Sequence, residues 1–155
     1  MQYIGTKIIN AEAMTRAAYN AFRGWTLPAD ENGEDEGYLV EYLDGGKANV
    51  PTHKGYVSWS PKEQFDAAYR ATDGFSFGLA LEALLKGQQV NRKGWNGKGM
   101  WVQYCRSMST VNLPHLELVY PVNSSAYPQG AYVPWAPSQT DMLADDWRIR
   151  TPSTI

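Results

Sequence analysis

Residues 75–102 read FSFGLALEALLKGQQVNRKGWNGKGMWV, and this stretch predicts a helix followed directly by β-structure. Apolar residues recur in its first part at the spacing of one helix face: Phe77, Ala80, Leu81, Leu84 and Leu85. Ser76 stands where a helix N-cap is expected, and Gly87 stands where a helix commonly ends. The pattern therefore predicts one amphipathic helix near the middle of the chain.

The chain beyond this helix contains strand-forming residues that Gly and Pro divide into short segments. We expect strands over five of these segments: 88–92, 100–106, 116–120, 131–133 and 147–150. Before the last of them, residues 138–141 predict a short helical turn. The pattern indicates antiparallel hairpins rather than β-α-β crossovers.

The first 73 residues predict a second unit of the same class. Strands are expected over three segments: 3–9, 37–43 and 55–59. One helix is expected over residues 11–22, ended by Gly24, and another begins with Ser60 as N-cap and Pro61 as its first residue. The chain is thus expected to be an α+β protein of two small domains, 1–73 and 74–155. Each would be a short antiparallel sheet packed with one or two helices.

Division of the chain at residues 73 and 74 separates an acidic half from a basic half. Residues 1–73 contain 7 Lys/Arg and 11 Asp/Glu, a net charge of −4, and residues 74–155 contain 7 and 5, a net charge of +2. Fluctuation of small counts is the alternative explanation of this asymmetry. The overall net charge of −2 argues against a protein that binds nucleic-acid polymers, because such proteins are usually strongly basic.

The composition is typical of a soluble globular protein. The 6 Trp, 10 Tyr and 4 Phe can bury enough apolar surface to exclude intrinsic disorder. No apolar run approaches the length of a membrane helix, and the N-terminal residues lack the pattern of a secretory signal. The 1 cysteine cannot form a disulfide within the chain, so a cytoplasmic location is expected.

No constellation in the sequence predicts catalysis, a cofactor or a metal ion. His53 and His115 lie in different halves and outside any H-x-x-x-H or C-x-x-C arrangement. Cys105 lies in an expected strand and is expected to be a small buried residue rather than a nucleophile. The adjacent Asp145 and Asp146 are expected to form a solvated turn or helix cap rather than an acid–base pair.

The segment NRKGWNGKGMW, residues 91–101, combines the residue types that bind a nucleotide-like anion. Its basic side chains, including Arg92, can pair with phosphate, and its glycines let backbone N–H groups approach an anion. Trp95 or Trp101 can stack on a base, and Asn96 can bond to a base edge or a ribose hydroxyl. A basic hairpin turn whose Trp residues pack in the core is the alternative, and the residues alone leave it open.

A second segment, WAPSQTDMLADDW, occupies residues 135–147. Ser138 is expected to cap a helical turn, with Asp141 as the acidic partner at the third position. Gln139 and Thr140 then lie at the start of that turn, where unpaired backbone N–H groups favour a phosphate.

Both segments, together with the preceding helix, resemble the Thoeris anti-defense 2 family of phage proteins. The resemblance rests on FSFGLALEALLKGQQV, on NRKGWNGKGMWV and on W-x-x-S-Q-T-D-M-L-A-x-D-W. It spans roughly residues 75–150. Residues 1–73 resemble a small phage-encoded module of unassigned function, which occurs alone or ahead of other modules.

The resemblance implies a protein that sequesters cyclic nucleotide immune signals without cleaving them. The signals are the glycocyclic ADP-ribose of Thoeris defence and, for some members, the cyclic dinucleotides of CBASS defence. It also implies a homotetramer with ligand sites at subunit boundaries, in the cytoplasm of the infected bacterial cell. Carried over by motif, the ligand-binding residues are Arg92, Trp95, Asn96, Trp101, Gln139, Thr140 and Asp141.

Two other functions stay open from the residues alone. One is an enzyme that processes the same nucleotide. The other is a structural or protein-interaction module of a phage, whose Trp residues would lie in the core and at interfaces.

Overall fold

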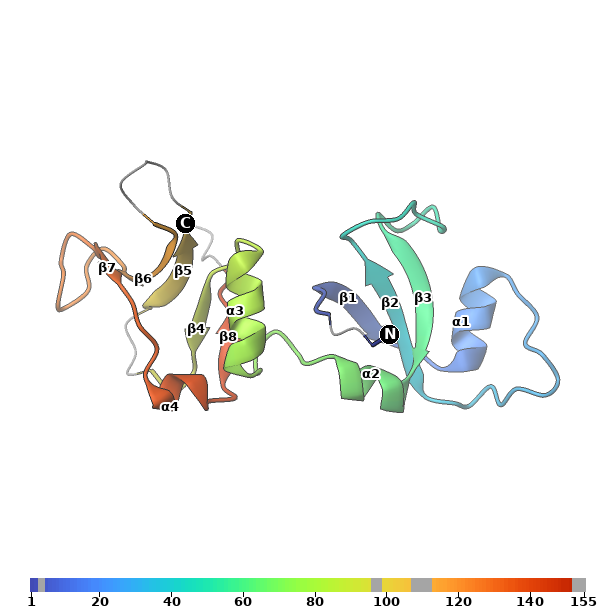
Figure 1. Cartoon of the computed structure of the whole chain (residues 1–155). Coiled ribbons are helices and arrows are strands. Elements are labelled where there is room, and N and C mark those ends of the chain that lie inside the picture. Colours follow the sequence, from blue (N-terminus) through green and yellow to red (C-terminus); the bar gives the residue numbers. More distant parts are fainter. Residues whose placement is uncertain (3–4, 96–98, 107–112, 152–155) are drawn as a thin grey trace. The chain divides into compact units, whose positions relative to one another are not determined.

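The computed structural model of the chain describes residues 1–2, 5–95, 99–106 and 113–151. The chain divides into two compact units, Met1–Tyr69 and Arg70–Ile155. Each unit contains one antiparallel sheet and short helices (Figure 1). The α+β class and the two small units that the sequence predicts are therefore confirmed.

The first unit is built on a three-stranded sheet in the order β1-β2-β3. Its elements are β1 (Ile9–Ala13), α1 (Arg16–Arg23), β2 (Gly37–Tyr42), β3 (Tyr56–Pro61) and α2 (Lys62–Ala68). The Thr15 hydroxyl caps α1 by accepting a hydrogen bond from the Ala18 N–H. Gly24 ends α1 with φ of 68°, a left-handed conformation that glycine adopts without a steric cost.

The two faces of this sheet bury different aromatic groups. One face carries the core of the unit, made by Tyr19, Leu39 and Val57. Trp59 packs against this core, and its indole Nε1 donates a hydrogen bond of 2.8 Å to the carbonyl of Met14. On the opposite face, Phe65 of α2 stacks on Tyr38 of β2 with ring centroids 4.0 Å apart. Tyr19 thus holds α1 to one face of the sheet, and Phe65 holds α2 to the other.

Three element boundaries in this unit differ from the sequence prediction. Residues 11–13 were expected in a helix, but they belong to β1 and pair with Tyr38, Leu39 and Val40 of β2. The strand expected over residues 3–9 begins only at Ile9, and residues 3–4 lie outside the described part. Ser60 was expected as the N-cap of α2, but it lies in β3 and Pro61 is the N-cap. At residues 11–13 and at Ser60, pairing with β2 extends a strand into residues whose local pattern predicts a helix.

The second unit is built on a five-stranded antiparallel sheet in the order β7-β6-β5-β4-β8. Its strands are β4 (Val90–Arg92), β5 (Trp101–Cys105), β6 (His115–Tyr120), β7 (Ala131–Pro134) and β8 (Trp147–Ile149). Its helices are α3 (Phe77–Leu85) and α4 (Gln139–Met142). Every strand and helix predicted for this part of the chain is confirmed, with differences of one or two residues at the ends.

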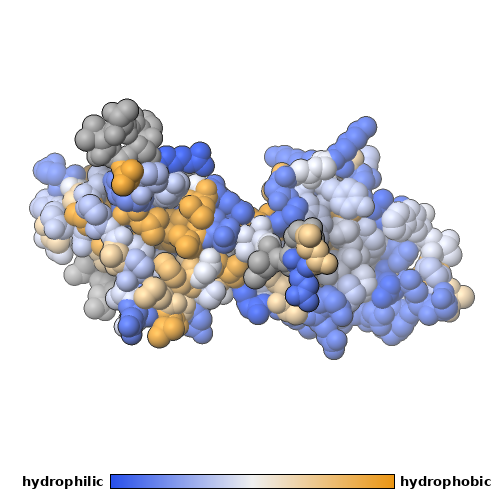
Figure 2. Space-filling view, viewed as in Figure 1, coloured by the Kyte–Doolittle hydropathy of each residue, from blue (hydrophilic) through white to orange (hydrophobic). Residues whose placement is uncertain are grey.

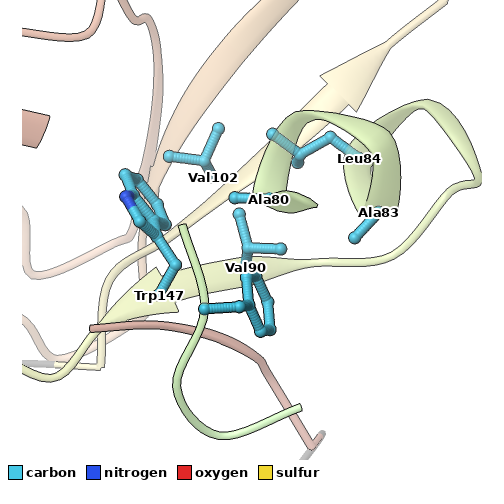
Figure 3. Close-up of a cluster of buried hydrophobic side chains, with 7 residues drawn as sticks. Ala80, Ala83, Leu84, Val90, Val102 and Trp147 are labelled. Atoms are coloured by element: carbon cyan, nitrogen blue, oxygen red, sulfur yellow. The ribbon is translucent and has the colours of Figure 1, made fainter. Parts of the chain in front are cut away.

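The core of the second unit lies between α3 and one face of its sheet. Figure 3 shows how Ala80, Ala83 and Leu84 of α3 face residues of three different strands. Those residues are Val90 of β4, Val102 of β5 and Trp147 of β8. Trp147 is 0% exposed, so the indole of β8 is enclosed by the cluster. Burial of this large ring ties β8 to the core of the unit, because aromatic side chains bury a large apolar area.

The opposite face of the sheet, the outer face, carries polar and aromatic side chains. Along β5, Trp101, Gln103 and Cys105 alternate with the core-facing residues of the strand and therefore point to the outer face. The Arg150 guanidinium lies 4.0 Å from the centroid of the Trp101 ring, which places a cation on that aromatic face. Glu117 is opposite Gln103 in the register of β6, so it shares this face.

The surface of the second unit also exposes apolar side chains around its helices (Figure 2). Leu81 and Leu85 are exposed on α3, and Met142 and Leu143 are exposed at the end of α4. Within the described part of the chain, we find no helix that combines the length and apolarity required to cross a bilayer.

Candidate functional site

The candidate site lies where β4 ends beside β8 and α4. The antiparallel register of β4 and β8 places Arg92 opposite Trp147. This pairing brings the first predicted binding segment to Asp146 and to α4, which come from the second predicted segment. Two segments that lie far apart in the sequence are thus brought together at one candidate site.

Arg92 is held between two carboxylates. Its Nε donates to Asp146 Oδ1 at 2.7 Å, and its Nη1 donates to Asp141 Oδ1 at 2.9 Å. The Arg92 side chain is 14% exposed, so these charge-assisted hydrogen bonds are partly shielded from water. The hydrogen bond with Asp146 is the main cause of the raised pKa of Arg92, which stays fully charged.

Asp141 is the hydrogen-bond acceptor on which the site is centred. Its Oδ2 completes a capping box with the N–H and hydroxyl of Ser138, at 3.1 and 2.7 Å. Its Oδ1 accepts from Arg92 and from the Trp95 indole Nε1, the latter at 3.1 Å. Partial burial disfavours the charged form, but these hydrogen bonds outweigh it and lower the pKa of Asp141 to about 2. The expected Ser138 cap is confirmed, and Asp141 also fixes Trp95.

Asp146 connects Arg92 to the glycine-containing turn after β4. Its Oδ2 accepts a hydrogen bond of 2.6 Å from the Gly94 N–H. Burial again opposes ionisation, yet the hydrogen bonds from Arg92 and Gly94 lower the pKa of Asp146. A Cβ at Gly94 would lie 2.8 Å from Asp146 Oδ2, so a larger residue here would displace this carboxylate.

Three indole rings meet at the site and join it to the core. The Trp95 ring packs edge-to-face against Trp135 and Trp147, with centroids 6.1 and 5.5 Å away. The Trp147 indole Nε1 donates to the carbonyl of Asp141 at 2.9 Å. Trp95 and Trp135 are half-buried whereas Trp147 is fully buried. The site therefore presents two oriented, partly accessible indoles on a rigid base.

The remaining predicted residues fall in three different places. Gln139 and Thr140 are exposed at the start of α4, next to this network, and the Thr140 carbonyl accepts from Arg92 at 3.4 Å. Trp101 lies on the outer face of the sheet, whereas Trp95 packs against the core on the opposite face. Asn96 lies outside the described residues. The structure thus brings Arg92, Trp95, Thr140 and Asp141 together but separates Trp101 from them.

Sequence reasoning missed Asp146 and Trp135 as parts of the site. Asp146 was expected in a solvated turn or helix cap, but it forms the shortest ion pair with Arg92. Asp146 directly precedes β8, the strand that pairs with β4, and this position was the signal that could have placed it near Arg92. Trp135 was recognised only as the first residue of the second segment, and nothing local predicts its contact with Trp95.

The charges of the network restrict what the site can bind. One guanidinium faces two carboxylates, so the group of Arg92, Asp141 and Asp146 carries a net charge of −1. A phosphate placed against Arg92 would meet that negative charge at close range, which is unfavourable. Lys93 directly follows Arg92 and is exposed, and its Nζ lies 3.8 Å from Asp73 Oδ2. The geometry suits a base or ribose at the network and a phosphate towards Lys93.

Comparisons with known proteins place these features in a family. Residues 75–150 match the family model described as the Thoeris anti-defense 2-like domain. The chain is also similar to Thoeris anti-defense 2 of Bacillus phage SP01, at 37% identity over 82 residues. That alignment covers 48% of this chain and 92% of the relative. The residues matched by the family model lie within the second unit and include both segments of the candidate site.

Proposed function

Since the chain belongs to the Thoeris anti-defense 2-like family, we propose that it sequesters a cyclic nucleotide signal of the host's defence without cleaving it. Its anti-defense role in phage infection follows from the family. Glycocyclic ADP-ribose is the proposed ligand, and the cyclic dinucleotides of CBASS are a second proposed class. Both offer flat bases, ribose hydroxyls and phosphates, which call for stacking, polar and cationic partners respectively.

The observation that carries this proposal is the orientation of Trp95. Its indole N–H is held by Asp141, and Asp141 is itself held by Arg92 and Ser138. A ring fixed in this way loses little conformational freedom when a base stacks on it, which favours affinity. In this proposal Trp95 stacks on a base, while Arg92 and Asp141 act mainly by positioning it.

The polar part of the ligand is assigned to the residues around that ring. The exposed Gln139 and Thr140 can bond to ribose hydroxyls or to a base edge. We assign Asn96 the same kind of role and Lys93 a phosphate contact. Trp101, on the outer face, would contact ligand only if another subunit brings that face to the site. The proposed homotetramer, with sites at subunit boundaries, would provide such an arrangement.

The electrostatics of the site support binding rather than catalysis. A general acid or base works best with a pKa near the working pH. The pKa of Asp141 is about 2 and that of Asp146 is also lowered, so both carboxylates are poorly suited to exchange protons at neutral pH. Their hydrogen bonds commit them to holding Arg92, Trp95 and Gly94.

The exposed apolar side chains of α3 and α4 support the proposed oligomer. Leu81, Leu85, Met142 and Leu143 lie on the same unit as the site. A contiguous apolar patch at a surface commonly marks a site of contact with a partner. Sedimentation of the full chain will test this directly, with a tetramer expected and a monomer contradicting it.

The mechanism can be tested by capture and release. The full chain is incubated with glycocyclic ADP-ribose, separated from free ligand and heat-denatured, and the supernatant is analysed. Intact ligand recovered in a stoichiometric amount is expected. A modified product would instead support an enzyme, and no bound ligand among glycocyclic ADP-ribose and cyclic dinucleotides would support a structural or interaction module.

The site can be tested with substitutions matched in chemistry. Trp95→Ala and Asn96→Ala are each expected to weaken ligand binding by more than about tenfold. Trp25→Ala is the control, because Trp25 is an exposed tryptophan of the first unit. Calorimetry measures the affinities, and circular dichroism confirms the fold of each variant. Unchanged affinity in folded Trp95→Ala protein would refute the site.

A further inference from the structure

Three metal-ligating side chains meet on the outer face of the second sheet, away from the site described above. The register of β5 and β6 places Cys105 directly opposite His115. Glu117 follows two residues later on β6, so its side chain points to the same face. The ligand atoms of all three residues lie within 4.8 Å of one another. The sequence predicts no metal site here, because pairing between strands, and not spacing along the chain, creates the cluster.

The hydrogen bonds of His115 orient it as a metal ligand. Its Nδ1 lies 2.8 Å from the Leu113 carbonyl, which can only accept, so Nδ1 carries the proton. In the neutral ring, Nε2 then has a free lone pair, and it faces Glu117 Oε1 at 3.3 Å. Two lone pairs at this distance repel unless a positive charge lies between them. A backbone carbonyl on Nδ1 with Nε2 free is the arrangement that commonly fixes a metal-bound histidine.

The distances fit tetrahedral coordination. Bond lengths of about 2.0–2.1 Å to nitrogen and oxygen place two such ligands about 3.3 Å apart at the tetrahedral angle. The distance between His115 Nε2 and Glu117 Oε1 has this value. A thiolate bonded at about 2.3 Å would lie about 3.6 Å from the nitrogen. This is about 1.2 Å shorter than the 4.8 Å within which the ligand atoms of the three residues lie. Rotation of its side chain supplies a movement of that size.

The surroundings orient the carboxylate and leave the cluster accessible. Gln103 Nε2 donates to Glu117 Oε2 at 3.3 Å, which leaves Oε1 directed at His115. The side chains of His115 and Glu117 are 36% and 18% exposed, and Cys105 is partly exposed rather than buried as expected. An ion from solvent can therefore reach the three ligands without opening the core.

We propose that Cys105, His115 and Glu117 form a binding site for a zinc-class divalent cation, with the fourth coordination position open to water or another ligand. Thiolate, imidazole and carboxylate together suit zinc better than magnesium or calcium, which prefer oxygen ligands. The ion would join β5 to β6 at the end of their ladder. The competing explanation of this cluster is a simple ion pair between protonated His115 and Glu117, in which the Cys105 thiol is not involved.

The test uses the full, untagged chain, freed of metal with a chelator and then titrated with Zn²⁺ against a chromophoric competitor at neutral pH. One ion per chain with a dissociation constant below about 10 μM is expected, and weaker binding overturns the proposal. Cys105→Ser and His115→Ala should each weaken binding by at least about tenfold. His53→Ala is the matched control, because this histidine lies in the first unit and should leave the affinity unchanged.

Cobalt provides an independent readout of the thiolate. Cys105 is the chain's 1 cysteine, so a sulfur-to-cobalt charge-transfer band in the presence of Co²⁺ can come only from this residue. The band should disappear in Cys105→Ser and persist in His53→Ala. Zn²⁺ should also slow alkylation of Cys105 in the unaltered chain, a measurement that requires no variant to fold. Absence of the band, absence of protection, or Zn²⁺ binding that Cys105→Ser leaves unchanged would each overturn the proposal.

Discussion

Replacement of Asp141 by asparagine tests the centre of the candidate site most directly. The carboxylate accepts hydrogen bonds on both oxygens, from Arg92 and Trp95 on one and from Ser138 on the other. An amide of the same size has one oxygen, and its NH₂ group would face donors where the carboxylate has acceptors. Asp141→Asn should therefore loosen the Trp95 ring and destabilise the second unit.

The magnitude follows from the pKa of Asp141, which is lowered from 3.8 to about 2. A shift of this size corresponds to about 2 kcal/mol of stability that the ionised group contributes. Because the pKa of the folded state is the lower one, this contribution is complete above the unfolded value of 3.8. It is lost as the pH falls through about 2. Asp141→Asn should thus cost about 2 kcal/mol at neutral pH and progressively less in acid.

Urea unfolding measured separately for each unit provides the assay. The indole N–H resonance of Trp147 reports the second unit, and that of Trp59 reports the first. Asp145→Asn is the control, because it removes the same charge from an exposed neighbour. The reasoning would be refuted if the two variants unfolded alike, or if the cost of Asp141→Asn were the same in acid as at neutral pH.

Three further predictions concern the fold. Leu84→Ala should destabilise the second unit by about 2–5 kcal/mol in urea unfolding, because Leu84 is fully buried, while Leu81→Ala on the same helix should cost much less. Gly24→Ala should lower the stability of the first unit by about 1 kcal/mol, since φ is 68° there, and Gly5→Ala, with open space around it, should not. Glu41→Gln should destabilise the first unit at neutral pH. The pKa of Glu41 is lowered mainly by the amide of Asn10 and then by the Gly55 N–H, so the difference in free energy of unfolding from the unaltered chain should shrink as the pH falls below 4.5.

The fold was predictable where local signals and tertiary contacts agree. The helix over Phe77–Leu85 was predicted from its apolar spacing and its terminating glycine. Ala80 and Leu84 of the predicted face pack in the core, whereas Leu81 and Leu85 are exposed. Residues 11–13 show the opposite case, because their two alanines favour a helix whereas pairing with β2 makes them a strand. The free energy of that pairing comes from residues more than twenty positions away, which a local pattern does not contain.

The candidate site was predictable in its residue types but only partly in its geometry. Arg92, Trp95 and Asp141 were predicted to act together, and they are in direct contact. Their detailed roles depend on Asp146, which reaches Arg92 only through the pairing of β4 with β8. The separation of Trp101 from Trp95 likewise depends on the alternation of side chains along β5, which turns Trp101 away from the core-facing Val102. Strand register, rather than composition, decides both outcomes.

The buried indole of β8 also has a consequence for synthesis of the protein. The segments that surround Trp147, from α3 to Val102, leave the ribosome first and share an apolar surface. Trp147 is translated roughly 45 residues after Val102, a delay of about 2–9 s at ~5–20 residues per second. During this interval the nascent chain exposes the surface that the indole later covers. The second unit can therefore close only after Trp147 has been translated, and chaperones that recognise apolar segments have time to bind before it does.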